Sequence, residues 1–137
     1  MPDIVHRVGI NASPFQVFEA LTTQEGLASW WTRQTTAEPK LGAVLQFRFG
    51  GGGPDMEVVE LDPPRLIRWK CLSGPSEWIE VDGETVVLFA HRKWHHESEF
   101  MAHCSAKWGY FFLGLKSLVE DGRGHPFPDD AKVSRWG

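Results

Sequence analysis

A single apolar stripe runs through the last third of the chain. Between Glu97 and Asp121 apolar residues recur at steps of four and three residues. This spacing predicts one long helix of about six or seven turns with one apolar face. Gly122 is expected to end the helix, because glycine readily takes the left-handed conformation that follows a helical segment. The stripe consists of Phe100, Cys104, Trp108, Phe111, Leu115 and Leu118.

The chain before this helix has a period of two over most of its length, which predicts strands. Two helices interrupt the pattern early. Ser13 is expected to cap the first, which spans Phe15 to Thr22, and Thr23 or Gln24 to open the second. The strands, joined mostly by short turns, form an antiparallel meander. They are expected at residues 3–10, 44–49, 56–61, 66–72 and 84–91.

These elements predict an α+β helix-grip fold. A curved antiparallel sheet wraps around the long C-terminal helix, and two short helices follow the first strand. The gap between such a sheet and its helix is a natural place for a cavity. We expect one domain over residues 1–125 and a polar, loosely docked tail over residues 126–137.

Composition excludes several classes of protein. A formal charge of −4 and the lack of a basic run disfavour binding to nucleic acid. The apolar runs are shorter than the ~20 residues that a membrane-spanning helix requires. Cys71 and Cys104 are expected to be buried thiols in a reducing cytoplasm. Seven Trp and nine Phe can fill a core or line a pocket with few residues.

Four strings of residues carry a likeness to a known family, over residues 3–122. The chain resembles the family named for activators of heat-shock protein 90 ATPase, in the START-like superfamily, also called Bet v 1-like or polyketide-cyclase-like. The strings are Ala12-Ser13-Pro14-xx-Val17-Phe18-xx-Leu21-Thr22 with Gly26-Leu27-xx-Trp30-Trp31, Val58-xx-Leu61-xx-Pro64-xx-Ile67-x-Trp69, Thr85-Val86-Val87-x-Phe89-x-His91, and Trp108 with Leu115-Lys116.

The resemblance implies a cavity that binds a small hydrophobic, aromatic or lipid-like molecule without catalysis. No catalytic residue, metal or cofactor is assigned. For each candidate residue, packing in the core without touching a ligand is the alternative. The candidates are Trp31, Phe47, Phe49, Ile67, Trp69, Val87, Phe89, His91, Trp108, Phe111, Phe112 and Leu115.

The chain departs from the family pattern between Trp69 and Thr85. The family has a further full strand there, whereas residues 76–81 of this chain are expected to supply only a stub. Either part of the hairpin is missing, or a stretch between Trp78 and Ile79 is omitted. A shortened hairpin would leave the cavity more open at that edge.

Two other functions are alternatives. A cyclase, aromatase or hydrolase would use the same cavity, with an inward His91, Arg48, Glu57 or Tyr110 handling protons. A module that binds a chaperone ATPase is the third possibility. The chain itself is expected to be a monomer or a weak homodimer.

Metal and phosphate sites are disfavoured. The metal hypothesis rests on His91, His95, His96 and His103. His96-Glu97 begins like a zinc-protease motif, but Phe100 stands where the second histidine is needed. Glu99 and His103 are better explained as a surface pair. Gly50–Gly53 joins two strands and does not open a helix, so a turn is favoured over a phosphate cradle.

Overall fold

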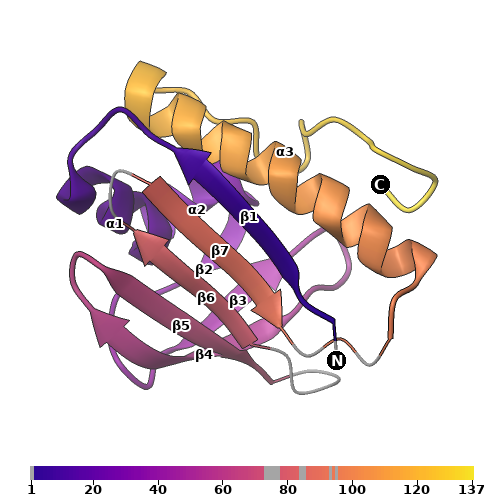
Figure 1. The fold of residues 1–137 in the computed structure, drawn as a ribbon, viewed down its shortest axis with the longest axis horizontal. Helices are drawn as coiled ribbons and strands as arrows, with labels where there is room; N and C mark the ends of the chain where they lie inside the picture. The colour runs from indigo at the N-terminus through magenta and orange to yellow at the C-terminus, as the bar shows by residue number, and fades with distance from the viewer. Residues whose placement is uncertain (1, 73–77, 84–85, 93, 95) are drawn as a thin grey trace.

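In the computed structural model, one long helix lies across a seven-stranded antiparallel sheet (Figure 1). The structure describes residues 2–72, 78–83, 86–92, 94 and 96–137. The strand order is β1-β7-β6-β5-β4-β3-β2. The elements are β1 (Ile4–Gly9), α1 (Pro14–Thr22), α2 (Gln24–Trp30), β2 (Gln34–Thr36), β3 (Val44–Arg48), β4 (Asp55–Asp62), β5 (Leu66–Cys71), β6 (Trp78–Gly83), β7 (Val86–Arg92) and α3 (Glu99–Asp121).

The predicted helix-grip fold is confirmed, together with its two early helices. Ser13 caps α1 in a reciprocal box: its hydroxyl accepts from the Gln16 backbone and Gln16 Oε1 accepts from the Ser13 backbone. Thr23 ends α1 and caps α2. Gly122 ends α3 with φ of 83°, as the sequence predicted. No described helix is long and apolar enough to span a membrane.

The sheet joins the first strand to the last. β1 pairs with β7 from Ile4 opposite His91 to Gly9 opposite Val86. At the other edge lies β2, which the sequence did not predict. Its three residues, Gln34, Thr35 and Thr36, are too few and too polar to show an alternating pattern.

The prediction of only a strand stub between Trp69 and Thr85 is wrong. β6 is a full strand that pairs with β5 on one side and β7 on the other. Trp78 and Ile79 are consecutive rungs of this ladder. Two flanking strands satisfy the backbone groups of β6, so Asp82 and Gly83 join it despite their low strand propensity. Asp82 and Gly83 are therefore strand residues, and residues 84 and 85 lie outside the described part of the chain.

The tail is held more tightly than its polar composition indicated. The Phe127 backbone N–H donates to Trp31 O at 2.9 Å, and Arg33 N–H donates to Phe127 O at 3.1 Å. Beyond this bridge the tail runs back along α3 (Figure 1). Contacts of Asp130 with Lys107 and of Ser134 with His103 hold it there. The division of the chain at residue 125 stays a prediction.

Candidate ligand-binding cavity

A cavity of about 700 Å³ lies between the sheet, α3 and the tail. Its wall is mostly aromatic and apolar, with polar side chains gathered where the tail meets α3. The lining residues are Trp31, Phe49, Gly53, Pro54, Met56, Cys71, His91, Trp94, Phe100, His103, Cys104, Lys107, Trp108, Phe111, Phe127, Asp130, Lys132, Trp136 and Gly137.

Trp31 is the centre of the aromatic wall. It directly follows α2, which places its ring between sheet and helix. The ring centroid lies 4.2 Å from that of Phe47, 4.9 Å from Trp108 and 5.9 Å from Phe49. Trp69 stacks on it at 6.3 Å with an interplanar angle of 8°. Such offset and tilted contacts fix the shape of the wall, since aromatic rings prefer them.

The structure divides the twelve predicted ligand-binding residues into two groups. Five line the cavity: Trp31, Phe49, His91, Trp108 and Phe111. The other seven are packed in the core with almost no exposed surface, and their contact with a ligand stays a prediction. They are Phe47, Ile67, Trp69, Val87, Phe89, Phe112 and Leu115.

His91 links the sheet to the long helix at the cavity wall. Its Nδ1 accepts a hydrogen bond from Trp108 Nε1 at 3.2 Å. A neutral imidazole that accepts at Nδ1 carries its proton on Nε2. The other acid–base candidates, Arg48, Glu57 and Tyr110, are not among the lining residues. Arg48 instead pairs with Asp55 at 2.7 Å and donates to backbone carbonyls next to the β3–β4 turn.

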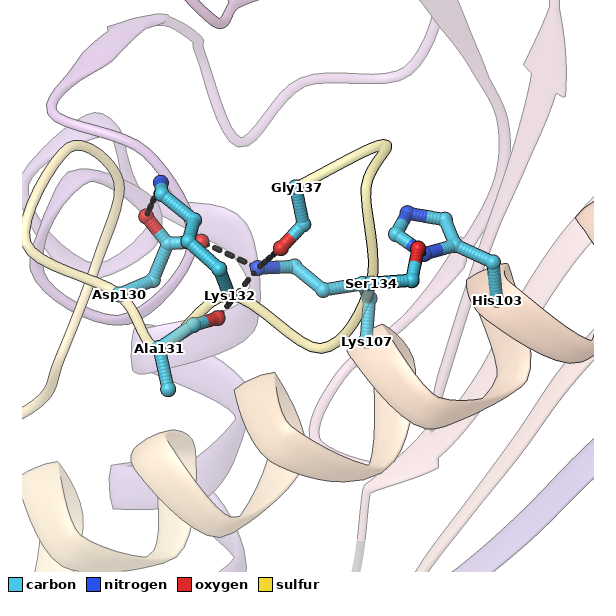
Figure 2. A network of polar contacts seen from close by, with 7 residues as sticks. All are labelled: His103, Lys107, Asp130, Ala131, Lys132, Ser134 and Gly137. Carbon is cyan, nitrogen blue, oxygen red and sulfur yellow. Dashed lines mark hydrogen bonds and ion pairs between the residues drawn. The ribbon is translucent and has the colours of Figure 1, made fainter.

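The polar end of the cavity is built around one buried carboxylate (Figure 2). Lys107 Nζ donates to Asp130 Oδ2, to Ala131 O at 2.9 Å and to Gly137 O at 3.4 Å. Lys132 Nζ donates to Asp130 Oδ1 at 3.3 Å. Burial alone would raise the pKa of Asp130, but the hydrogen bonds from Lys107 and Lys132 and the charge of Lys107 outweigh it and hold the pKa below its ordinary value. Asp130 is therefore ionised at neutral pH.

His103 closes the same end from α3. Burial lowers its pKa, and the neighbouring charge of Lys107 lowers it further, so the neutral ring is favoured. Its Nδ1 lies 2.7 Å from Ser134 Oγ, and its ring contacts Phe100 and Trp136. Within the described residues no group of three potential metal ligands occurs. His95 lies outside them.

Sequence reasoning missed the tail half of the site. Phe127, Asp130, Lys132 and Trp136 all line the cavity, although the tail was expected to be loose. The isolated Trp136 in a polar segment was the available signal, because a large apolar side chain usually finds a surface to cover. Cys71 and Cys104, which were expected to be buried, are instead half-buried thiols that line the cavity.

The comparison that decides the family covers most of the chain. The sequence model of the family described as Activator of Hsp90 ATPase homolog 1-like protein matches residues 11–120. The chain belongs to this family. The match ends before the tail, and the tail of this Activator of Hsp90 ATPase homolog 1-like chain forms one wall of the cavity.

Solved structures agree with this assignment. The Aha1 dimer from Colwellia psychrerythraea is 40% identical, with a TM-score of 0.84 over 90% of this chain and 100% of that one. Two more distant structures share the START-like fold: DynU16 of the dynemicin biosynthetic locus (23% identity, TM-score 0.77, 95% of this chain and 50% of that one) and CalU16 from Micromonospora echinospora (14%, 0.71, 88% and 77%). Among curated proteins, none has a sequence that matches this chain.

Proposed function

We propose that this family member binds a small hydrophobic or aromatic molecule in the cavity between sheet and α3. The supporting observation is the cavity itself, whose volume of about 700 Å³ lies in the range of ligand pockets. Trp31, Phe49, Trp108 and Phe111 supply the apolar wall. Binding without catalysis is the first proposal, since most of the lining is unreactive.

Burial supplies the affinity. A ligand that removes roughly 200 Å² of its apolar surface from water gains about 5 kcal/mol at ~25 cal/mol per Å². Part of this gain is lost to the entropy of association. The aromatic wall reduces that loss because the rings of Trp31, Phe47 and Trp69 already hold each other in place.

The test is a thermal-shift and calorimetric screen of flavonoids, polyketide-like aromatics, fatty acids and sterols. A true ligand at a hundred times its Kd adds about 2.7 kcal/mol to the free energy of unfolding. Cys104→Phe should reduce this shift, because Cys104 lines the cavity and the larger ring would occupy part of it. Leu113→Phe is the matched control on the exposed face of the same helix. If no compound binds, or if both variants bind alike, the proposal fails.

Catalysis in the same cavity is the second candidate, and His91 favours it. Its ring lines the cavity with an Nδ1 held by Trp108, the arrangement expected of a positioned proton carrier. Mass spectrometry of compounds that bind would detect a cyclised, dehydrated or hydrolysed product. His91→Phe should then remove product formation and leave binding intact. If the compounds are recovered unchanged, the catalytic candidate is contradicted and the proposal of binding without catalysis stands.

Partners and location remain further proposals. The Colwellia relative is described as a dimer, so we propose a weak homodimer for this chain as well. Sedimentation velocity over a hundredfold concentration range tests it, since a constant sedimentation coefficient would contradict it. A chaperone interaction follows from the family description alone and is tested by pull-down with purified chaperone. The cytoplasm is the proposed compartment, on the basis of two reduced thiols.

A further inference from the structure

The polar end of the cavity contains charged side chains of both signs. Two ammonium groups, of Lys107 and Lys132, surround the single carboxylate of Asp130. Asp130 stays ionised because the lysines lower its pKa, and His103 stays neutral near pH 7 because burial and Lys107 lower its pKa. These three charged side chains lie beside an aromatic chamber, and the Gly137 oxygen, which also lines the cavity, accepts from Lys107.

The two lysines are not equivalent. Lys107 is 14% exposed and points its three N–H groups at three oxygens of the tail. It is a structural cation. Lys132 is 55% exposed, and in the described part of the chain its one hydrogen-bond acceptor is Asp130 Oδ1, at 3.3 Å. Its ammonium lies 5.3 Å from the centroid of the Phe127 ring, which lines the cavity. Lys132 therefore has donors to spare at the cavity wall.

Lys132 lies outside the segment that the family model matches. The family match ends at residue 120, whereas Lys132 and Asp130 stand in the tail. The apolar wall of Trp31, Phe49 and Trp108 lies inside the matched segment. The apolar wall and the charged side chain beside it therefore come from different parts of the chain.

We infer that the ligand is an amphiphile with an oxyanion head group. Its apolar body lies against Trp31, Phe49 and Trp108, and its head group accepts hydrogen bonds from Lys132. Lys132 is then a specificity-determining residue. The inference rests on the proposed binding function and adds the chemical class of the ligand. In water an exposed ion pair is weak, but the apolar wall next to Lys132 reduces screening and strengthens it.

Two dyes with the same apolar body test the inference. 1-Anilinonaphthalene-8-sulfonate carries an oxyanion, and N-phenyl-1-naphthylamine lacks it. We expect the native chain to bind the sulfonate more tightly. Lys132→Gln should weaken sulfonate binding about three- to tenfold, the range of a partly screened ion pair, and leave the neutral dye unchanged. Lys132→Arg should retain the preference, and Lys40→Gln, at an exposed loop remote in sequence from the tail, should change nothing.

Salt dependence provides a second readout. Raising the salt concentration from 50 to 500 mM should weaken sulfonate binding to the native chain and affect Lys132→Gln much less. Equal affinity for both dyes, or a Lys132→Gln variant that binds the sulfonate like the native chain, would overturn the inference while cavity binding stands. Failure of both dyes to bind, or binding of both dyes that Cys104→Phe leaves unchanged, would overturn the binding proposal itself. Melting curves of each variant establish that it is folded.

Discussion

At the scale of single residues, Gly26 marks the closest approach of α1 and α2. A Cβ atom there would lie 2.7 Å from both the Cα and the carbonyl oxygen of Ala20, and backbone atoms cannot swing away. The same carbonyl accepts the Trp30 indole N–H at 2.8 Å, so any shift also disturbs a buried tryptophan. We predict that Gly26→Ala lowers the free energy of unfolding by about 1–3 kcal/mol in urea denaturation.

Gly109 provides the control for this prediction. It lies inside α3, where a Cβ would meet only His6 Cε1 at 3.7 Å, an ordinary contact. Gly109→Ala should be neutral or stabilising by up to about 1 kcal/mol, because alanine favours the helix. Equal losses for the two variants would contradict the explanation from backbone contact.

His103 gives the stability a pH dependence. Burial and Lys107 lower its pKa below the ordinary 6.5, so the unfolded chain takes up this proton more readily than the folded one. The folded state therefore loses stability as the pH falls through 6.5 toward the folded pKa. Urea unfolding at pH 7.5 and 5.5 measures the loss. It should be smaller in His103→Gln than in the native chain, whereas His96→Gln, at an exposed position, should behave like the native chain.

At the scale of elements, the tail depends on Asp130. Its side chain is 3% exposed and neutralises Lys107, which is itself largely buried. Asp130→Asn leaves that ammonium without its counter-charge, and we predict a loss of roughly 2–4 kcal/mol. Hydrogen exchange at residues 126–137 should locate the loss in the tail.

The neighbouring carboxylate is a matched control. Asp129 pairs with Arg33 at 2.8 Å, but both side chains are more than half exposed. Asp129→Asn should cost less than about 1 kcal/mol, as exposed ion pairs do. If it released the tail as readily as Asp130→Asn, charge burial would not be the cause of docking.

Elements with a clear period could be predicted from the sequence, and those without one could not. The α3 stripe and the Ser13 cap are local signals, and the structure has both. β2 is three polar residues, and β6 forms because strands lie on both sides of it. The tail was missed for the same reason: Asp130 is buried beside Lys107, which stands 23 residues earlier in the chain. A local sequence pattern does not reveal which distant segments will pair.

The candidate site could be predicted in part. Trp31, Trp108 and Phe111 were identified because the resemblance places a cavity between sheet and helix, and they line it. Alternation identifies which side chains of a strand face inward, but it does not show how deeply each is buried. Phe47 and Phe89 were therefore grouped with residues that reach the cavity. Both are fully buried.

At the scale of the whole molecule, the two paired strands that lie farthest apart in the sequence are β1 and β7. Ile4 in β1 is opposite His91 in β7, whereas Ile67 in β5 is opposite Leu61 in the neighbouring β4. Closing the long loop costs more chain entropy, so we expect β4 and β5 to pair before β1 docks. Ile67→Val should mainly slow folding, and Ile4→Val should mainly speed unfolding.

Stopped-flow refolding and unfolding in urea would separate these effects. Both isoleucines are buried, so each change should cost about 0.5–1.5 kcal/mol, and the equilibrium losses are comparable. A larger effect of Ile4→Val on the folding rate would reverse the proposed order.

The arrangement around Trp31 also has an optical consequence. The Trp31 ring lies 6.1 Å from Trp30, 6.3 Å from Trp69 and 4.9 Å from Trp108. Indoles this close pass excitation energy among themselves, so light absorbed by any of the four is shared. A quencher that enters the cavity and contacts only Trp31 or Trp108 therefore reduces the fluorescence of all four tryptophans. The loss of emission should exceed the share of one residue among the seven tryptophans of the chain.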